Sequence, residues 1–115
     1  MPDRSRWRAP QRVRTFISTE LDTTRHTTDP WPALERAHIA AQPWARDHTI
    51  AHLRMLRYAI RQRDRHEIGG QLLRILVAAP GSLTGRYPPG NTGRATTPLT
   101  ATADVPAEIA ELLAQ

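Results

Sequence analysis

The sequence predicts an all-α fold, either a small helical bundle or a set of tetratricopeptide-like helical hairpins. Apolar residues recur at three- and four-residue spacing through most of the first 80 residues, which is the period of a buried helix face. Helix-starting and helix-stopping residues separate these stretches. We expect four parts: a disordered basic arm over residues 1–9, a helical core domain over 10–80, a Gly/Pro/Thr-rich loop over 81–104 that packs on the core, and a C-terminal helix over 105–115.

The arm carries Arg4, Arg6 and Arg8 around Trp7, with nothing that packs periodically. The first predicted helix follows it, over about residues 11–25. Pro10 suits the first helical position, whereas the threonines near the end of this helix weaken it, because β-branched residues lose rotamer freedom in helices. The residues at helical spacing on its buried face are Val13, Phe16, Ile17 and Leu21.

The second predicted helix covers residues 30–41. Asp29 can accept hydrogen bonds from the first free amides of the helix, Pro30 is tolerated at its first position, and Pro43 ends it. His38 falls inside the apolar stripe and should therefore face a neighbouring helix. Counted at about 100° per residue, that stripe consists of Trp31, Leu34, Ala37, His38 and Ala41.

The third predicted helix covers about residues 44–62 and has three sides. The predicted apolar face consists of Ala45, Thr49, Leu53, Leu56 and Ile60. A separate arginine stripe consists of Arg54, Arg57, Arg61 and Arg65. The remaining side flanks the apolar face away from the arginines and consists of His48, His52, Met55 and Ala59.

The fourth predicted helix covers about residues 65–79. Asp64 and Glu67 resemble a capping box at its start, and Pro80 with Gly81 should end it. Its predicted buried side consists of Ile68, Leu72, Ile75 and Leu76. A short terminal helix over residues 106–114 carries Ile109, Leu112 and Leu113.

The composition favours a soluble, cytoplasmic protein. Cysteine is absent, which excludes disulfides and thiolate metal sites, and no run approaches the ~20 apolar residues of a membrane span. All 16 basic residues are arginine and the net charge is +5. That charge suits an anionic partner such as nucleic acid or an acidic protein, although codon bias in a GC-rich genome is the favoured account of the arginines.

Four residues near the turn at Pro43 form a candidate transition-metal site. His38 lies five residues before Pro43 and His48 five after it, so an antiparallel fold-back brings them to the same height. His52 follows His48 at i, i+4, level with Glu35. The predicted metal-binding residues are Glu35, His38, His48 and His52.

Nitrogen-rich ligation without sulfur suits Zn, Cu, Ni or Fe, with Glu35 as a ligand or as a partner that orients a histidine. The alternative interpretation is that the histidines fill space or bond to neighbours, and that Glu35 pairs with Arg36, Arg54 or Arg57. No cysteine and no Gly-x-Ser-x-Gly elbow is present to support nucleophilic catalysis. Metal handling is therefore favoured over an enzyme activity. The alternative functions are a tetratricopeptide-like protein-interaction module and a basic nucleic-acid-binding accessory protein.

Two further features suggest contacts with an anion or a partner. Arg54, Arg57 and Arg61 could track phosphates or an acidic protein surface, or could simply form a solvated helix face. In the loop over residues 88–94, free amides near Asn91 could bind an anion with help from Arg94 and Arg86. Alternatively, this loop is a structural strap in which Asn91 caps a helix end.

Several segments resemble a bacterial family known as domain of unknown function 3703. The resemblance covers about residues 31–113 and rests on LERAHIAAQ at 34–42, HTIAHLRML at 48–56, RQRDRHEIGGQLLRI at 61–75, PPGNTGRA at 88–95 and VPAEIAELL at 105–113. It implies a small bacterial helical protein with tetratricopeptide-like pairs. The Thr-rich residues 23–28 depart from the Ala-rich helix expected there.

Overall fold

The computed structural model describes residues 6–115, and every regular element in that range is an α-helix. The all-α prediction is therefore confirmed. Within residues 6–115, none of the helices is long and apolar enough to cross a membrane. The helices are α1 (Gln11–Thr23), α2 (Trp31–Ala41), α3 (Ala45–Arg61), α4 (Arg65–Thr84) and α5 (Ala107–Ala114).

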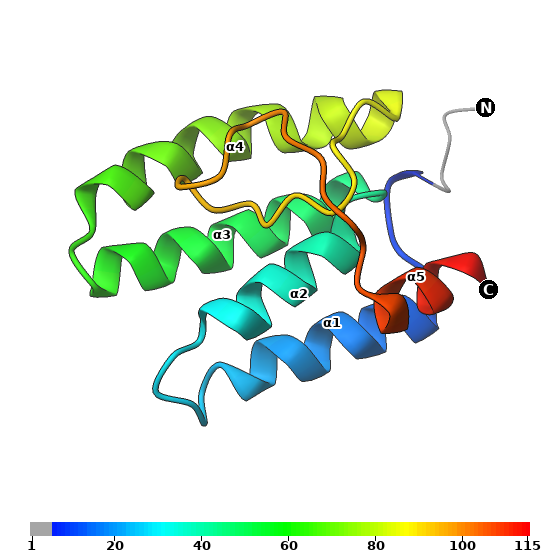
Figure 1. The fold of residues 1–115 in the computed structure, drawn as a ribbon, viewed down its shortest axis with the longest axis horizontal. Helices are drawn as coiled ribbons and strands as arrows, with labels where there is room; N and C mark the ends of the chain where they lie inside the picture. Colours follow the sequence, from blue (N-terminus) through cyan, green and yellow to red (C-terminus); the bar gives the residue numbers. More distant parts are fainter. Residues whose placement is uncertain (1–5) are drawn as a thin grey trace.

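The first four helices form two antiparallel hairpins, α1 with α2 and α3 with α4 (Figure 1). The short turn over residues 42–44 joins the hairpins and places α2 against α3. After α4 the chain forms a strap, residues 85–106, which runs back across the faces of α4, α3 and α2 (Figure 1). The strap ends in α5, which packs against α1 and α2.

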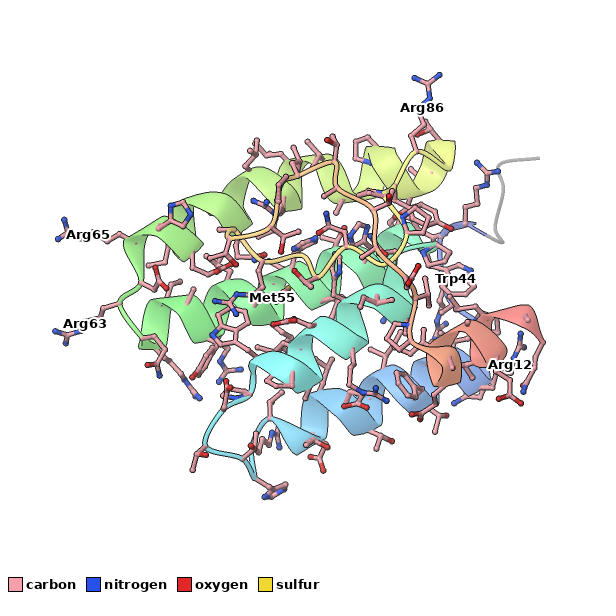
Figure 2. All side chains as sticks on the ribbon, viewed as in Figure 1. Arg12, Trp44, Met55, Arg63, Arg65 and Arg86 are labelled. Atoms are coloured by element: carbon pink, nitrogen blue, oxygen red, sulfur yellow. The ribbon has the colours of Figure 1, made fainter. Side chains whose placement is uncertain are left out.

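Small side chains fill the contacts between the helices. Met55 lies between the helices, whereas Arg63, Arg65 and Arg86 extend away from them (Figure 2). Leu34, Ala37, His38 and Ala41 of α2 are buried as predicted, with Trp31 at the edge of the core. The predicted face of α1 is also confirmed, because Val13, Ile17 and Leu21 are buried and Phe16 packs beside them.

The predicted apolar face of α3 is wrong except for Ala45, which is buried. Leu53 and Ile60 are 47% and 54% exposed, and Thr49 and Leu56 are only half-buried. The helix is instead rotated toward the side that carries the histidines, so that the buried residues are Ala45, Asp47, His48, Ala51, His52, Met55 and Ala59. The alanines of α3 let α2 and α4 each pack closely against this helix. The hydrogen bonds described below satisfy the Nδ1 atoms of the buried His48 and His52 rings.

The predicted buried side of α4 is also wrong. Leu72 and Leu76 are 52% and 74% exposed, and Ile68 and Ile75 are half-buried. The helix turns a largely polar stripe inward, consisting of Glu67, Gln71, Arg74, Ala78 and Ser82. Each polar member of this stripe hydrogen-bonds to the histidine cluster, the strap or the α2–α3 turn.

Pro80 and Gly81 do not end α4, contrary to the prediction. The helix continues to Thr84 and ends at Gly85, which has the left-handed φ of +72° typical of a helix end. Pro80 lies on the exposed side, and the extra turn brings Ser82 to His48. At the other end the Asp64 cap is confirmed, since the Glu67 amide donates to Asp64 at 3.1 Å.

The strap and the residues before α1 both pack on the helices. A Cβ atom added to Gly70 would lie 2.3 Å from the Cβ of Ala95, so the strap is seated directly on α4. Of the predicted disordered arm, residues 1–5 lie outside the described residues, whereas residues 6–9 contact the helices. The Ala9 amide donates to the buried Asp47 carboxylate at 2.7 Å, and the Arg46 amide donates to the Trp7 carbonyl at 2.8 Å.

The two adjacent glycines of α4 should respond oppositely to alanine. Gly69→Ala meets nothing within 4 Å and should raise the free energy of unfolding by about 0.5–1 kcal/mol, the helix-propensity gain. Gly70→Ala gains the same propensity but drives a methyl group into Ala95, an overpacking cost of about 1–3 kcal/mol. Urea denaturation measures both, and stabilisation by Gly70→Ala would contradict a strap seated on α4.

Candidate metal centre

Three buried histidines converge at the centre of the α2–α3–α4 layer. His38 comes from α2, and His48 and His52 come from successive turns of α3; none is more than 5% exposed. Their Nε2 atoms lie 2.9 Å apart for His38 and His48, 3.0 Å for His38 and His52, and 3.1 Å for His48 and His52. The fold-back at Pro43 therefore brings these three predicted residues together.

The other ring nitrogen of His48 fixes the tautomer of this residue. Its Nδ1 atom lies 2.9 Å from the Ser82 hydroxyl, which donates its own proton to the Gln42 carbonyl at 2.5 Å. The hydroxyl can therefore only accept from His48. Nδ1 carries the proton, and the Nε2 atom of neutral His48 presents a lone pair to the other two rings.

His52 is held in the same tautomer by a longer chain of hydrogen bonds. Its Nδ1 atom lies 2.7 Å from Oε1 of Gln71. The Gln71 amide nitrogen donates to the Glu67 carboxylate and to the Gly93 carbonyl, both at 2.8 Å, so the orientation of the amide is fixed and Oε1 accepts. The Nε2 atom of His52 consequently carries a second lone pair, and it lies 3.1 Å from Nε2 of His48.

His38 cannot satisfy the cluster in either tautomer. With the proton on Nε2 it can donate to the other rings, but its buried Nδ1 then lacks a donor, because no described residue makes a hydrogen bond of good geometry there. The nearby Asn91 backbone favours the protonated form of the ring and so raises its pKa in part. With the proton on Nδ1, three lone pairs face one another at about 3 Å. A cation at the centre removes the conflict, since it accepts all three lone pairs.

The strap covers the His38 ring. A Cβ atom added to Gly93 would lie 2.8–2.9 Å from atoms of this ring, and the backbone there has a φ of +84°. Glycine is therefore required at this position for two reasons, space and conformation. The adjacent Asn91 holds the strap in shape, because its side chain donates to the carbonyls of Pro98 and Ala101 and accepts from the Gly93 amide.

Burial keeps all three imidazoles neutral at physiological pH. Loss of hydration is the largest cause in each case, and it lowers the pKa of His48 to about 3 and of His52 to about 4. Burial also lowers the pKa of His38 well below its usual value, and the nearby His52 and His48 lower it further. Neutral imidazole is the form that binds metal ions, so the lone pairs are available.

Glu35 does not join the cluster. Successive positions at i, i+3 on a helix diverge by about 60° around the axis, and the Glu35 carboxylate lies 3.5 Å from Arg94 instead. The Arg94 guanidinium also donates to Glu67 at 2.9 Å and stacks 3.6 Å above the Trp31 ring. Among the described residues, the set with metal-ligand spacing is His38, His48 and His52 alone.

The residues predicted to bind an anion or a partner are not brought into one site. Arg54, Arg57 and Arg61 line a groove beside the α1–α2 connection, together with Arg25. Asn91 is buried and organises the strap rather than capping a helix end. Arg94 is engaged with Glu67 and Glu35, and Arg86 extends away from the helices (Figure 2).

Sequence reasoning missed the residues that orient the histidines. Gln71 and Ser82 bond the imidazoles directly, and Glu67 fixes Gln71. A signal for them exists, since Glu67, Gln71, Arg74, Ala78 and Ser82 recur at helical spacing and form a stripe of their own. The apolar stripe on the same helix was the stronger pattern and gave the opposite orientation.

Fold and site together define a small all-α protein with a buried tri-histidine cluster. The family described as "Protein of unknown function (DUF3703)" matches residues 11–113, and the chain belongs to that family. The resemblance inferred from the sequence motifs is thereby confirmed. No curated protein and no solved structure matches the chain.

The cluster should make the metal-free protein sensitive to mild acid. Because the folded-state pKa values of the three histidines lie below the ordinary value of about 6.5, the unfolded chain binds protons first as the pH falls. This stability is fully present above that value and is lost as the pH falls toward the folded-state pKa values, with a slope that approaches about 1.4 kcal/mol per pH unit for each histidine.

Urea unfolding with chelator present, repeated between pH 7.5 and 5.5, measures this slope. The His52→Gln variant removes one of the three buried imidazoles and should lower the slope by about a third. A free energy of unfolding that stays constant over this range in the unsubstituted protein would contradict the buried, neutral cluster.

Proposed function

We propose that the protein binds a divalent transition-metal ion through the Nε2 atoms of His38, His48 and His52. The observation that carries the proposal is the mutual separation of 2.9–3.1 Å between three ring nitrogens, at least two of which carry a lone pair instead of a proton. Such an arrangement is unfavourable for the protein alone and favourable around a cation. Metal handling is the role we propose first.

The spacing of the nitrogens favours adjacent coordination positions. With metal–nitrogen bonds of about 2.0–2.1 Å, a tetrahedral ion separates its ligands by about 3.3–3.4 Å, and an octahedral ion separates adjacent ligands by about 2.9 Å. The separations in this cluster lie close to the second value. Three protein ligands leave one position free on a tetrahedral ion and three on an octahedral ion, so a further ligand could bind in either geometry.

The surroundings of the rings support a metal site over a set of core histidines. Metal-bound imidazoles usually donate their second nitrogen to a protein acceptor, which fixes the ring and raises its basicity. Ser82 and Gln71 supply these acceptors to His48 and His52. Three neutral nitrogen ligands without sulfur suit Zn, Cu, Ni or Fe in the divalent state.

Metal titration followed by calorimetry tests the proposal on the full chain. We expect one ion per chain for the unsubstituted protein. His48→Ala and His52→Ala should each weaken binding by more than about 100-fold, beyond the range typical for loss of an orienting partner. His66→Ala, which removes an exposed histidine of α4, is the matched control and should bind normally.

Two outcomes would count against the site. One is the absence of stoichiometric binding by the unsubstituted protein at neutral pH. The other is equal affinity in the His48 and His52 variants and the control, because the ion would then be held elsewhere on the chain.

A further inference from the structure

A cavity opens directly onto the histidine cluster. It has a volume of about 400 Å³, within the range of pockets that hold small organic ligands. The three histidines line it from one side, and the C-terminal half of α4 and the strap line it from the others. Most of the wall is apolar, and the residues that line it include Leu76, Val77, Pro80, Tyr87 and Leu99.

The cavity accounts for apolar side chains that the fold leaves in water. Leu76 is 74% exposed, Val77 41% and Leu99 37%, and all three line the cavity. Leu76 and Val77 belong to α4 and Leu99 to the strap, so they face the cavity from both walls. An apolar body bound here would cover them, which is a favourable burial that the protein alone does not achieve.

A buried positive charge lines the same cavity. The Arg74 guanidinium donates to the carbonyls of Gly70 and Thr97, at 3.1 and 2.8 Å, and the residue is only 6% exposed. It forms no ion pair with any carboxylate in residues 6–115. A guanidinium has five N–H donors, so capacity remains for an anion.

The nearby carboxylate of Glu67 already accepts hydrogen bonds from three other groups. It accepts from Arg94 at 2.9 Å, from the Ala95 amide at 2.8 Å and from Gln71 at 2.8 Å. Burial alone would raise the pKa of Glu67, but these three donors together lower it, so the group is ionised and satisfied where it is. Burial lowers the pKa of Arg74 and the charge of Glu67 raises it in part, but the two side chains form no ion pair.

Charge balance points to an anionic ligand. Three neutral imidazoles leave the double charge of a divalent ion uncompensated, and Arg74 adds another positive charge at a low-dielectric wall. A carboxylate matches the planar guanidinium and can also bind a metal ion. A phosphate would need more free donors than this apolar wall offers.

We infer, on the basis of the proposed metal site, that the cavity binds a small organic monocarboxylate. Its carboxylate faces the ion and Arg74, and its apolar body lies against Leu76, Val77 and Leu99. The ligand thus occupies the coordination positions that the histidines leave free. The protein then recognises a carboxylate by charge and by the length of its apolar chain.

Visible absorption of the full chain loaded with Co(II) tests this inference. Acetate, butyrate and hexanoate should each change the cobalt spectrum, with affinity rising by about two- to fourfold for each added methylene group. Hexanamide, which has the same body without the charge, should bind at least about tenfold more weakly than hexanoate. Equal affinity for acetate and hexanoate, or for hexanoate and hexanamide, would overturn the inference.

Variants separate the two halves of the ligand. Arg74→Gln should weaken hexanoate binding by about tenfold while the cobalt stoichiometry stays at one. Arg65→Gln, remote from the cavity, should leave the affinity for hexanoate unchanged. Leu76→Ala, at an exposed position, should weaken hexanoate binding severalfold and leave the affinity for acetate unchanged. The leucine variant and the ligand series in the unsubstituted protein remain decisive if Arg74→Gln does not fold.

The outcome also distinguishes this inference from the proposed function. Failure to load Co(II) would overturn the metal site itself. Normal loading of Co(II), with a spectrum that no carboxylate alters, would overturn the carboxylate ligand and leave the metal site standing.

Discussion

The hydrogen bonds from α4 to the back of the histidine rings constrain much of this structure. Ser82 and Gln71 accept the Nδ1 protons of His48 and His52, and so direct both remaining lone pairs at His38. To supply these acceptors, α4 must turn its polar stripe inward and continue past Pro80. The strap must also lie close, because the Gly93 carbonyl helps to fix Gln71.

This arrangement runs against the most stable use of the same helices. A helix with Leu72, Leu73, Leu76 and Val77 would ordinarily bury them, yet all four are more than 40% exposed while Glu67 and Gln71 are buried. Local rules are most often broken at functional sites, where the polar arrangement is what is needed. The inversion of α4 is therefore itself an argument that the cluster has a function.

The sequence predicted the helices of the core and the meeting of the histidines, because both depend on local signals. Pro43 marks the turn, and equal spacing on either side of it sets the heights of His38 and His48. The rotation of α3 and α4 was not predictable from apolar periodicity, since burial of His52 or Gln71 depends on partners distant in the chain. Glu35 lies about 60° around α2 from His38, and its carboxylate pairs with Arg94 of the strap.

Nitrogen NMR of the imidazole rings tests the central claim most directly, because it reports which ring nitrogen carries the proton. In metal-free protein at neutral pH, His48 and His52 should both carry the proton on Nδ1. Addition of Zn(II) should then shift the Nε2 resonances of all three clustered histidines and leave the Nδ1 protons of His48 and His52 in place. Protons on Nε2 of His48 and His52, or Nε2 resonances that ignore the metal, would contradict the account.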